Sequence, residues 1–352
     1  MPVFPAAGRV GLAAGLLLVL TGCQAGYYWH LARGHTALMR ERVPVETVLA
    51  DPATPAALRE RLAAAGQMLT FADTALALPV DDAYRTFVAL ERGFVVWNLF
   101  AAPAFSLTPE TWCFPVAGCS SYRGYFDLER AERDAARLRD EGLDVYGGGA
   151  VAYSTLGWFS DPLTTPMLHG TQADVAELLF HELAHRRFYL PGDTRFNESL
   201  ATSVGREGAR RWLAAHGDPA LMGGLQDSDR ARATVMALVQ SAREDLATLY
   251  ASPASESAQR AGKATIQARL REDYRAALAL DPSLAPYQRW FDGPLNNAQL
   301  NTLSDYNQWV PAFDALLLHC GGQWACFWQA VEQLADLPPP ARTAQLNQWM
   351  TP

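Results

Sequence analysis

The sequence predicts a mainly α (α+β) fold in which a small β-sheet precedes a pair of helices and a long helical C-terminal part. Apolar residues recur at helical spacing over residues 24–78 and again through most of residues 230–350. Between these parts, residues 143–156 alternate apolar and small side chains around three glycines, a pattern typical of strands. Prolines and glycines separate the segments, as expected for turns.

Residues 24–78 are predicted to be helical, with prolines interrupting the helical spacing of apolar side chains. Residues 83–100 carry aromatic side chains on several faces, which indicates a buried helix or a passage from helix to strand. Residues 101–125 contain three prolines and two cysteines and are predicted to be irregular. A charged amphipathic pattern over residues 126–142 ends at Gly142, so a helix is expected there.

Residues 143–156 predict a strand pair, or one strand that another part of the backbone approaches closely. A loop over residues 157–170 leads to a helix over residues 171–190, with Thr171 as a candidate N-cap. A short turn separates this helix from a second one over residues 196–215. The remaining chain is predicted to be mostly helical, over residues 230–250, 258–280, 297–318 and 324–334.

The first residues indicate the compartment. Arg9 precedes the apolar run of residues 10–20, which is too short to span a bilayer as a helix and fits a secretory signal. The sequence Leu-Thr-Gly-Cys that ends at Cys23 resembles the bacterial lipobox, where the peptide is cut before a cysteine that then carries lipid. We therefore expect residues 1–22 to be a lipoprotein signal peptide and residues 23–352 to form a single domain.

Lipid on Cys23 would hold the chain at a membrane, since each buried CH₂ group contributes about 0.8 kcal/mol. Gln24 follows the cysteine in place of aspartate, which by resemblance to Gram-negative sorting favours the periplasmic face of the outer membrane. The expected localisation is thus the cell envelope, with a lipid anchor. The alternative is an ordinary signal peptide followed by a coincidental cysteine.

The other four of the five cysteines suggest two disulfides, as is common in exported proteins. The pairs Cys113 with Cys119 and Cys320 with Cys326 have the same spacing, and glycines or prolines within each pair allow a turn. We therefore favour these two local disulfides. Four buried thiols are the alternative, while a zinc ribbon is disfavoured because neither pair has the Cys-x₂₋₄-Cys spacing.

The composition argues against a nucleic-acid partner. The formal net charge is -8, and the chain has no basic stripe. With 49% hydrophobic residues it is long and apolar enough to bury a large core, so its function must come from local chemistry.

The sequence His181-Glu182-Leu183-Ala184-His185 is the strongest functional signal. Histidines four positions apart on a helix differ by about 40° in direction, so both imidazoles can bind one metal ion. The glutamate projects beside them and can accept a proton from a water molecule that the metal activates. Catalytic zinc has three protein ligands and one open position, so a third ligand is expected nearby.

Glu198 is the candidate third ligand. Pro191 and Gly192 end the first helix, and a chain that folds back there places His185 and Glu198 at similar heights on facing helices. The alternative is a solvated face of histidine and glutamate on a surface helix. Apolar residues around the motif argue against it, because buried charge is unfavourable unless it is paired or bound to metal.

The pattern HELAH followed by NESLA resembles the gluzincin metallopeptidases. More closely, the chain resembles a bacterial lipoprotein family labelled "putative aminopeptidase", through residues 97–126, 152–163, 180–202 and 295–313. This resemblance implies a gluzincin-like helical zinc-peptidase domain whose zinc helix pair covers about residues 171–215. It also implies that His181, His185 and Glu198 bind one zinc ion and that Glu182 is the general base.

Two features depart from the better-known gluzincins. Only 12 residues separate His185 from Glu198, so the connection is shorter. Gly205 stands where zinc aminopeptidases often carry a second glutamate.

A tyrosine usually stabilises the oxyanion in gluzincins, and Tyr306 is favoured here because it lies in a resembling stretch. Tyr153, Tyr250 and Tyr274 are the other candidates, and for each tyrosine a purely structural role is the alternative. Residues 147–153 could be an edge strand that pairs with an extended substrate, or simply a glycine-rich hairpin.

The predicted function is a zinc-dependent peptidase, by resemblance an aminopeptidase, with a peptide substrate and with a membrane contacted through lipid on Cys23. The alternative is a non-enzymatic envelope lipoprotein with a structural metal site. Structural zinc normally has four protein ligands, whereas only three are evident, and a structural site has no use for Glu182. The choice between aminopeptidase and endopeptidase stays open, because no group that would bind a free amine is identified.

Overall fold

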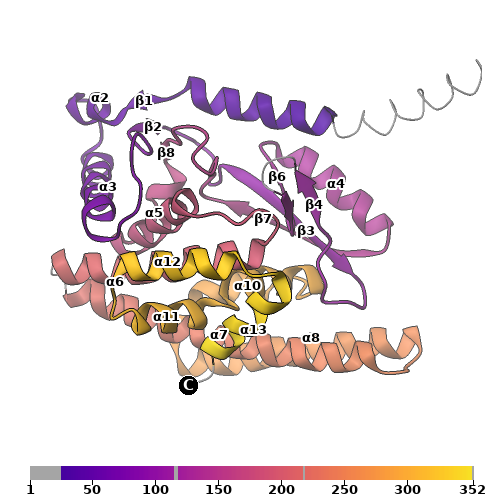
Figure 1. Ribbon diagram of the computed structural model, residues 1–352. Helices are drawn as coiled ribbons and strands as arrows, with labels where there is room; N and C mark the ends of the chain where they lie inside the picture. Colours follow the sequence, from indigo (N-terminus) through magenta and orange to yellow (C-terminus); the bar gives the residue numbers. More distant parts are fainter. Residues whose placement is uncertain (1–24, 115–117, 217–218, 351–352) are drawn as a thin grey trace, which may run out of the picture.

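The computed structural model describes residues 25–114, 118–216 and 219–350, and it confirms a mainly helical fold with small sheets (Figure 1). The expected signal peptide and Cys23 lie outside the described residues. Within the described ranges, no helix combines the length and the apolar character needed to cross a membrane.

The largest sheet has three antiparallel strands, and β7 lies at one of its edges. In spatial order these strands are β6 (Tyr122–Tyr125), β3 (Val96–Pro103) and β7 (Leu143–Ala150). Consecutive side chains of β3, from Leu99 to Ala102, are all buried, so both faces of this central strand are covered. Of the aromatic residues in 83–100, Phe87, Trp97 and Phe100 lie in strands and Tyr84 and Phe94 lie in turns or loops, so the expected helix there is wrong.

Two smaller sheets complete the β-structure. One contains β1 (Val43–Pro44), β2 (Thr86–Val88) and β8 (Leu163–Thr164), and the other contains β4 (Trp112–Phe114) and β5 (Gly118–Ser120). Residues 101–125, predicted to be irregular, thus hold the end of β3 and three short strands. Residues 143–150 form one strand, so the alternative of a strand pair there is wrong, and the loop expected over residues 157–170 includes β8 and a short 3₁₀ helix at Pro166–Leu168.

The helices at the centre of the molecule are α5 (Gln172–Arg187) and α6 (Thr194–His216), which pack against each other along their length. Their buried side chains belong to the largest hydrophobic core, where Phe180 and Phe196 are fully enclosed. The helices that share this core are α3 (Ala56–Ala75), α11 (Val310–His319), α12 (Trp324–Ala335) and α13 (Pro339–Trp349).

A second core lies between α7 (Pro219–Ala251), α8 (Glu256–Leu280) and α10 (Asn297–Asn307). One helix was expected over residues 297–318, but two separate helices, α10 and α11, form there. Pro311 lies in the first turn of α11, where its missing N–H removes no helical hydrogen bond. The remaining short helices are α2 (Val45–Ala50), α9 (Gln288–Phe291) and a 3₁₀ helix at Pro282–Tyr287.

The face of the large sheet is covered by α4 (Leu128–Asp140) and by a helix at the start of the described chain, residues 25–40. In Figure 1 this first helix lies across the top of the molecule, the sheet lies below it, and most of the C-terminal helices fill the lower half. The helix α10 contacts β3 and β7 from the lower side. The helix α10 therefore lies between the large sheet and α6, so both the sheet and the C-terminal helices surround the α5–α6 pair.

Candidate metal centre

The helix α5 begins with a capping box. The Thr171 hydroxyl accepts a hydrogen bond from the Asp174 amide at 3.2 Å, and the Asp174 carboxylate accepts one from the Thr171 amide at 2.8 Å. These bonds satisfy two amides at the helix end that have no partner within the helix. From this start, the helical repeat brings His181 and His185 to the same side of α5, facing α6.

Three side chains converge at this point. The Nε2 atoms of His181 and His185 are 3.2 Å apart, and they lie 3.3 and 3.5 Å from Oε2 of Glu198. Although both imidazoles are close, this buried carboxylate oxygen has no well-aligned hydrogen-bond donor among the described residues. Two imidazole nitrogens and one carboxylate oxygen that face a common point, one of them without a hydrogen-bond partner, fit a metal ion, and this ligand set is one that zinc uses.

The charges of the group are strongly coupled. Burial opposes ionisation of Glu198, but the neighbouring His181 and His185 outweigh burial and lower the pKa of its carboxyl to about 2. Burial likewise opposes protonation of His185, yet its contact with Glu198 raises the pKa of its ring. The carboxylate is therefore ionised at neutral pH, as a metal ligand must be.

A tight turn places Glu198 opposite the histidines. Gly192 adopts a φ of +85°, which glycine tolerates without strain. The Asn197 side chain then holds the turn closed, because its Oδ1 accepts from the Leu190 amide and its Nδ2 donates to the Leu190 carbonyl, both at 2.8 Å. Asp193 accepts a hydrogen bond from the Phe196 amide at 3.1 Å and so caps the start of α6.

Gly205 lets the two helices approach each other closely. A methyl group built on this residue would lie 2.6 Å from the Glu177 carbonyl oxygen and 3.2 Å from Cβ of His181. No side chain fits between the helices at this point. The packing of α6 against the face of α5 that carries His181 therefore leaves no room for a glutamate at this position.

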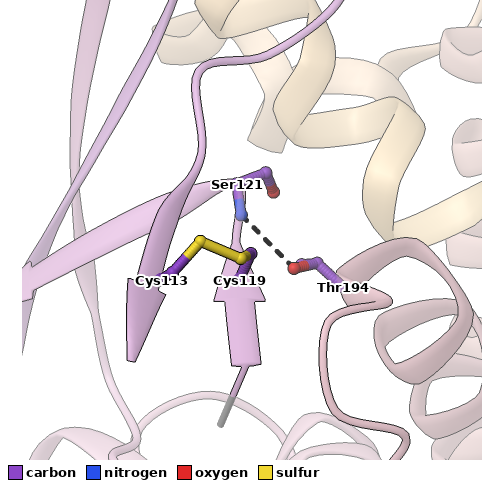
Figure 2. Close-up of a disulfide and its surroundings, with 4 residues drawn as sticks. All are labelled: Cys113, Cys119, Ser121 and Thr194. Atoms are coloured by element: carbon purple, nitrogen blue, oxygen red, sulfur yellow. Dashed lines mark hydrogen bonds between the residues drawn. A yellow bond between two sulfur atoms is a disulfide. The ribbon is translucent and has the colours of Figure 1, made fainter. Parts of the chain in front are cut away.

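A disulfide hairpin packs against the same turn (Figure 2). Cys113 and Cys119 are directly opposite each other in β4 and β5 and form a disulfide. A Cβ atom on Gly118 would lie 2.5 Å from the Gly192 nitrogen, so the hairpin backbone touches the turn. The Ser121 amide donates to the Thr194 hydroxyl at 3.3 Å and joins the hairpin to the start of α6. The other favoured pair, Cys320 and Cys326, also forms a disulfide, between α11 and α12.

Glu182 lies beside these three candidate ligands and is only 9% exposed. It lines the same cavity as His181 and Glu198. Burial raises the pKa of its carboxyl, the two histidines partly oppose this rise, and the charge of Glu198 adds to it. A carboxylate whose pKa moves toward neutrality is a better proton acceptor for catalysis than an exposed one.

Two tyrosines lie beside the three candidate ligands. The Tyr306 ring, from α10, stacks on the His181 ring with centroids 6.1 Å apart and an angle of 12°. The Tyr122 hydroxyl, from β6, donates to Oε1 of Glu198 at 3.5 Å. Burial, and next the charge of Glu198, raise the pKa of both phenols, so both stay protonated and able to donate.

Tyr122 was not among the candidates from sequence, although it lies in residues 97–126, one of the resembling stretches. The Tyr250 hydroxyl donates to the Asn297 side chain at 2.9 Å, and the Tyr274 hydroxyl donates to the Leu284 carbonyl at 3.0 Å. Neither of these two tyrosines lines the cavity, whereas Tyr153 does.

A hydrogen-bonded connection fixes α10 to α6. The Ser199 hydroxyl donates to the Asp305 carbonyl at 3.3 Å and accepts from the Trp309 amide at 3.2 Å. The Asp305 carboxylate accepts from the Ser121 hydroxyl at 2.7 Å. Since Ser199 follows Glu198 and Asp305 precedes Tyr306, these bonds set the distance between the metal ligand and the tyrosine ring.

The three candidate ligands line a cavity of about 1050 Å³. Residues 148–154, from the end of the edge strand β7 onward, form one wall. Gly149 is required there because a Cβ atom would overlap the Phe94 ring, so a side chain, and not another backbone, makes the close approach. Much of the remaining lining is aromatic.

Acidic side chains outnumber basic ones around this cavity. Its described lining includes the carboxylates of Asp174, Glu177, Glu182 and Glu198. Arg232 is the single arginine or lysine among these described lining residues. Arg232 is itself paired with Glu177 at 2.7 Å. The carboxylates of Glu182 and Glu198 therefore favour a cation such as a metal ion at this wall of the cavity.

Comparison with known proteins gives one family. A family model described as "Putative aminopeptidase" matches residues 26–346, which include α5, α6 and α10. No curated protein and no solved structure matches at a significant level.

Proposed function

The chain belongs to the "Putative aminopeptidase" family, and we propose that it is a zinc-dependent peptidase whose metal is held by His181, His185 and Glu198. The convergence of these three ligand atoms beside the buried Glu182, at the wall of a large cavity, carries the proposal. A zinc ion bound there would supply Lewis-acid activation of water and of the peptide carbonyl.

The protein side chains then have separate roles. Glu182 accepts the proton of the attacking water and returns it to the leaving amine, which its burial and its place beside the ligands favour. Tyr306 donates a hydrogen bond to the carbonyl oxygen as negative charge develops on it. Tyr122 orients Glu198 through the carboxylate oxygen that does not face the histidines.

The substrate is proposed to be an extended peptide with a free amino terminus. The edge of β7 beside the cavity offers backbone groups to which such a peptide can add as a strand. The family description supports a substrate with a free amino terminus. A structural metal site is disfavoured, because structural zinc normally has four protein ligands and has no role for a cavity or for Glu182.

The localisation is proposed to be the cell envelope, with lipid on Cys23 as the anchor. The lipobox-like residues 20–23 support this proposal.

The test uses the purified full chain with a peptide library that contains free and acetylated amino termini, before and after a chelator and after zinc is added back. Hydrolysis should require zinc and a free terminus. Glu182→Gln should keep its zinc and lose about 10²- to 10⁴-fold in rate, while Glu198→Gln should lose zinc by elemental analysis. Glu132→Gln, on the exposed side of α4, is the matched control.

Full activity of Glu182→Gln, or hydrolysis that the chelator leaves unchanged, would refute the zinc-peptidase mechanism. Equal cleavage of free and acetylated peptides would refute the aminopeptidase assignment alone.

A further inference from the structure

The first described helix, residues 25–40, is firmly packed through one face. Tyr27 and Leu38 are only 2% and 4% exposed. The Tyr27 hydroxyl donates to the Gly124 carbonyl at 2.9 Å, and the Arg123 guanidinium lies 3.7 Å from the centre of the Tyr27 ring. Tyr27 and Leu31 also line the cavity of the metal centre. The helix is therefore a fixed wall of the molecule with a definite outer face.

The outer face of this helix is basic and carries an exposed tryptophan. Trp29 is 73% exposed, and Arg33, Thr36 and Arg40 lie along the same stripe of the helix at spacings of three and four residues. Residues 25–40 contain no aspartate or glutamate, although the whole chain has a net charge of -8. Neither Arg33 nor Arg40 has an ion-pair partner in the part of the chain that the structure describes.

An aromatic loop lies beside the same helix. Trp158 and Phe159 are 70% and 56% exposed, and with Trp29 they are the exposed tryptophan and phenylalanine side chains of the described residues. The Phe159 ring lies 4.6 Å from the His35 ring of the helix, and the Arg42 side chain donates to the Ser160 carbonyl at 3.3 Å. The loop that carries Trp158 and Phe159 thus packs against the helix that carries Trp29.

We propose that this surface, defined by Trp29, Arg33, Arg40, Trp158 and Phe159, docks onto an anionic phospholipid bilayer. Tryptophan and phenylalanine are favoured at the boundary between headgroups and acyl chains, and arginines near an anionic surface are attracted to it. The two arginines of the helix favour an anionic membrane as the occupant, although the exposed Asp82 accepts a hydrogen bond from Ser160 in the aromatic loop.

The position in the chain agrees with this occupant. Only Gln24 separates the proposed lipid attachment at Cys23 from the first residue of the described helix. A lipid there would bring the outer face of the helix to the membrane, while its inner face still lines the cavity. The docking surface does not depend on the metal or on the peptidase activity.

The test uses the full chain reconstituted into vesicles that contain phosphatidylglycerol with brominated acyl chains, which quench tryptophan on contact. The emission of Trp29 is the difference between wild type and Trp29→Phe. In the brominated vesicles this Trp29 emission should be about twofold or more lower than without bromine, because the ring would lie at the acyl boundary. Trp349, read in the same way through Trp349→Phe, lies in α13 and should be unquenched.

Charge reversal tests the lipid class. Arg33→Glu/Arg40→Glu should lower the ratio of docked to undocked Trp29 by about 30-fold or more. Arg139→Glu/Arg275→Glu has the same net charge and should leave the ratio unchanged, since both arginines are exposed on other helices. Circular dichroism confirms that all variants are folded.

Quenching of Trp29 no greater than that of Trp349 would overturn the proposal, and it would be the result if an envelope protein covers this surface instead. Equal quenching in phosphatidylcholine vesicles, or in the charge-reversed variant, would overturn the selectivity for anionic lipid.

Discussion

Gly205→Ala tests the close contact between α5 and α6, the helices that carry the proposed metal ligands. The added methyl group would lie 2.6 Å from the Glu177 carbonyl oxygen, a contact that real Cβ atoms do not make. The obstructing atom belongs to the backbone of a helix, so it cannot rotate away as a flexible side chain would. The helices α5 and α6 must separate by several tenths of an ångström, and Glu198 must move away from His181, which is 3.3 Å from it.

The magnitude follows from two opposing contributions. Replacing a glycine inside a helix by alanine stabilises it by about 0.5–1 kcal/mol. Overpacking a close contact destabilises by about 1–3 kcal/mol, and contact with a backbone atom favours the upper part of this range. Gly66→Ala in α3 is the matched control, because its methyl group would meet no atom within 4 Å. The two variants should therefore differ in the free energy of unfolding by about 1–3 kcal/mol.

The assay is urea unfolding of both variants and wild type, followed by zinc titration of the folded proteins. Gly66→Ala should be as stable as wild type or more so, with unchanged zinc affinity. Gly205→Ala should be less stable and should bind zinc more weakly, because its ligands no longer meet at one point. Equal stability of the two alanine variants, with unchanged zinc affinity in both, would refute the account of Gly205.

Three further predictions concern side chains around the site. Tyr306→Phe should lower kcat by about 10²- to 10³-fold with zinc content unchanged. Tyr122→Phe should instead weaken zinc affinity by about 10- to 100-fold. Kinetics and metal titration measure both effects, and the same loss in both variants would contradict their separate roles. Asn197→Ala leaves the amide and carbonyl of Leu190 without their hydrogen bonds, so it should destabilise by about 2 kcal/mol or more in urea unfolding; an unchanged midpoint would count against the turn. Burial raises the pKa of Asp161 to about 6, above its value in the unfolded chain, so its contribution to stability is complete below about pH 4 and is lost as the pH rises through 6. The stability of wild type relative to Asp161→Asn should therefore fall by up to about 3 kcal/mol from pH 4 to pH 7, and a difference that stays constant with pH would exclude this titration.

Several features of the protein follow from the sequence because they depend on residues that are close together in the chain. The helical repeat alone puts His181 and His185 on one side of a helix. Pro191 and Gly192 make a turn that returns the chain, so Glu198 was predictable as the residue that faces them. The helical character of the C-terminal part was predicted in the same way, from periodic apolar residues.

Tertiary packing decided the features that depend on distant segments. The central strand β3 is covered on both faces, so it lacks the alternation that identifies a half-buried strand, and residues 83–100 were expected to be partly helical. Tyr122 and Tyr306 reach the metal ligands from β6 and α10, which are far apart in the chain and are joined to α6 by hydrogen bonds through Ser121, Ser199 and Asp305.

Gly205 shows the limit of local reasoning most clearly. In the sequence it is only the place where a glutamate is missing, because nothing near it in the chain indicates a neighbour. In the structure the backbone of another helix lies where a side chain would begin. A short-range pattern can specify which atoms bind a metal, but the space around those atoms is set by contacts between segments that the pattern does not relate.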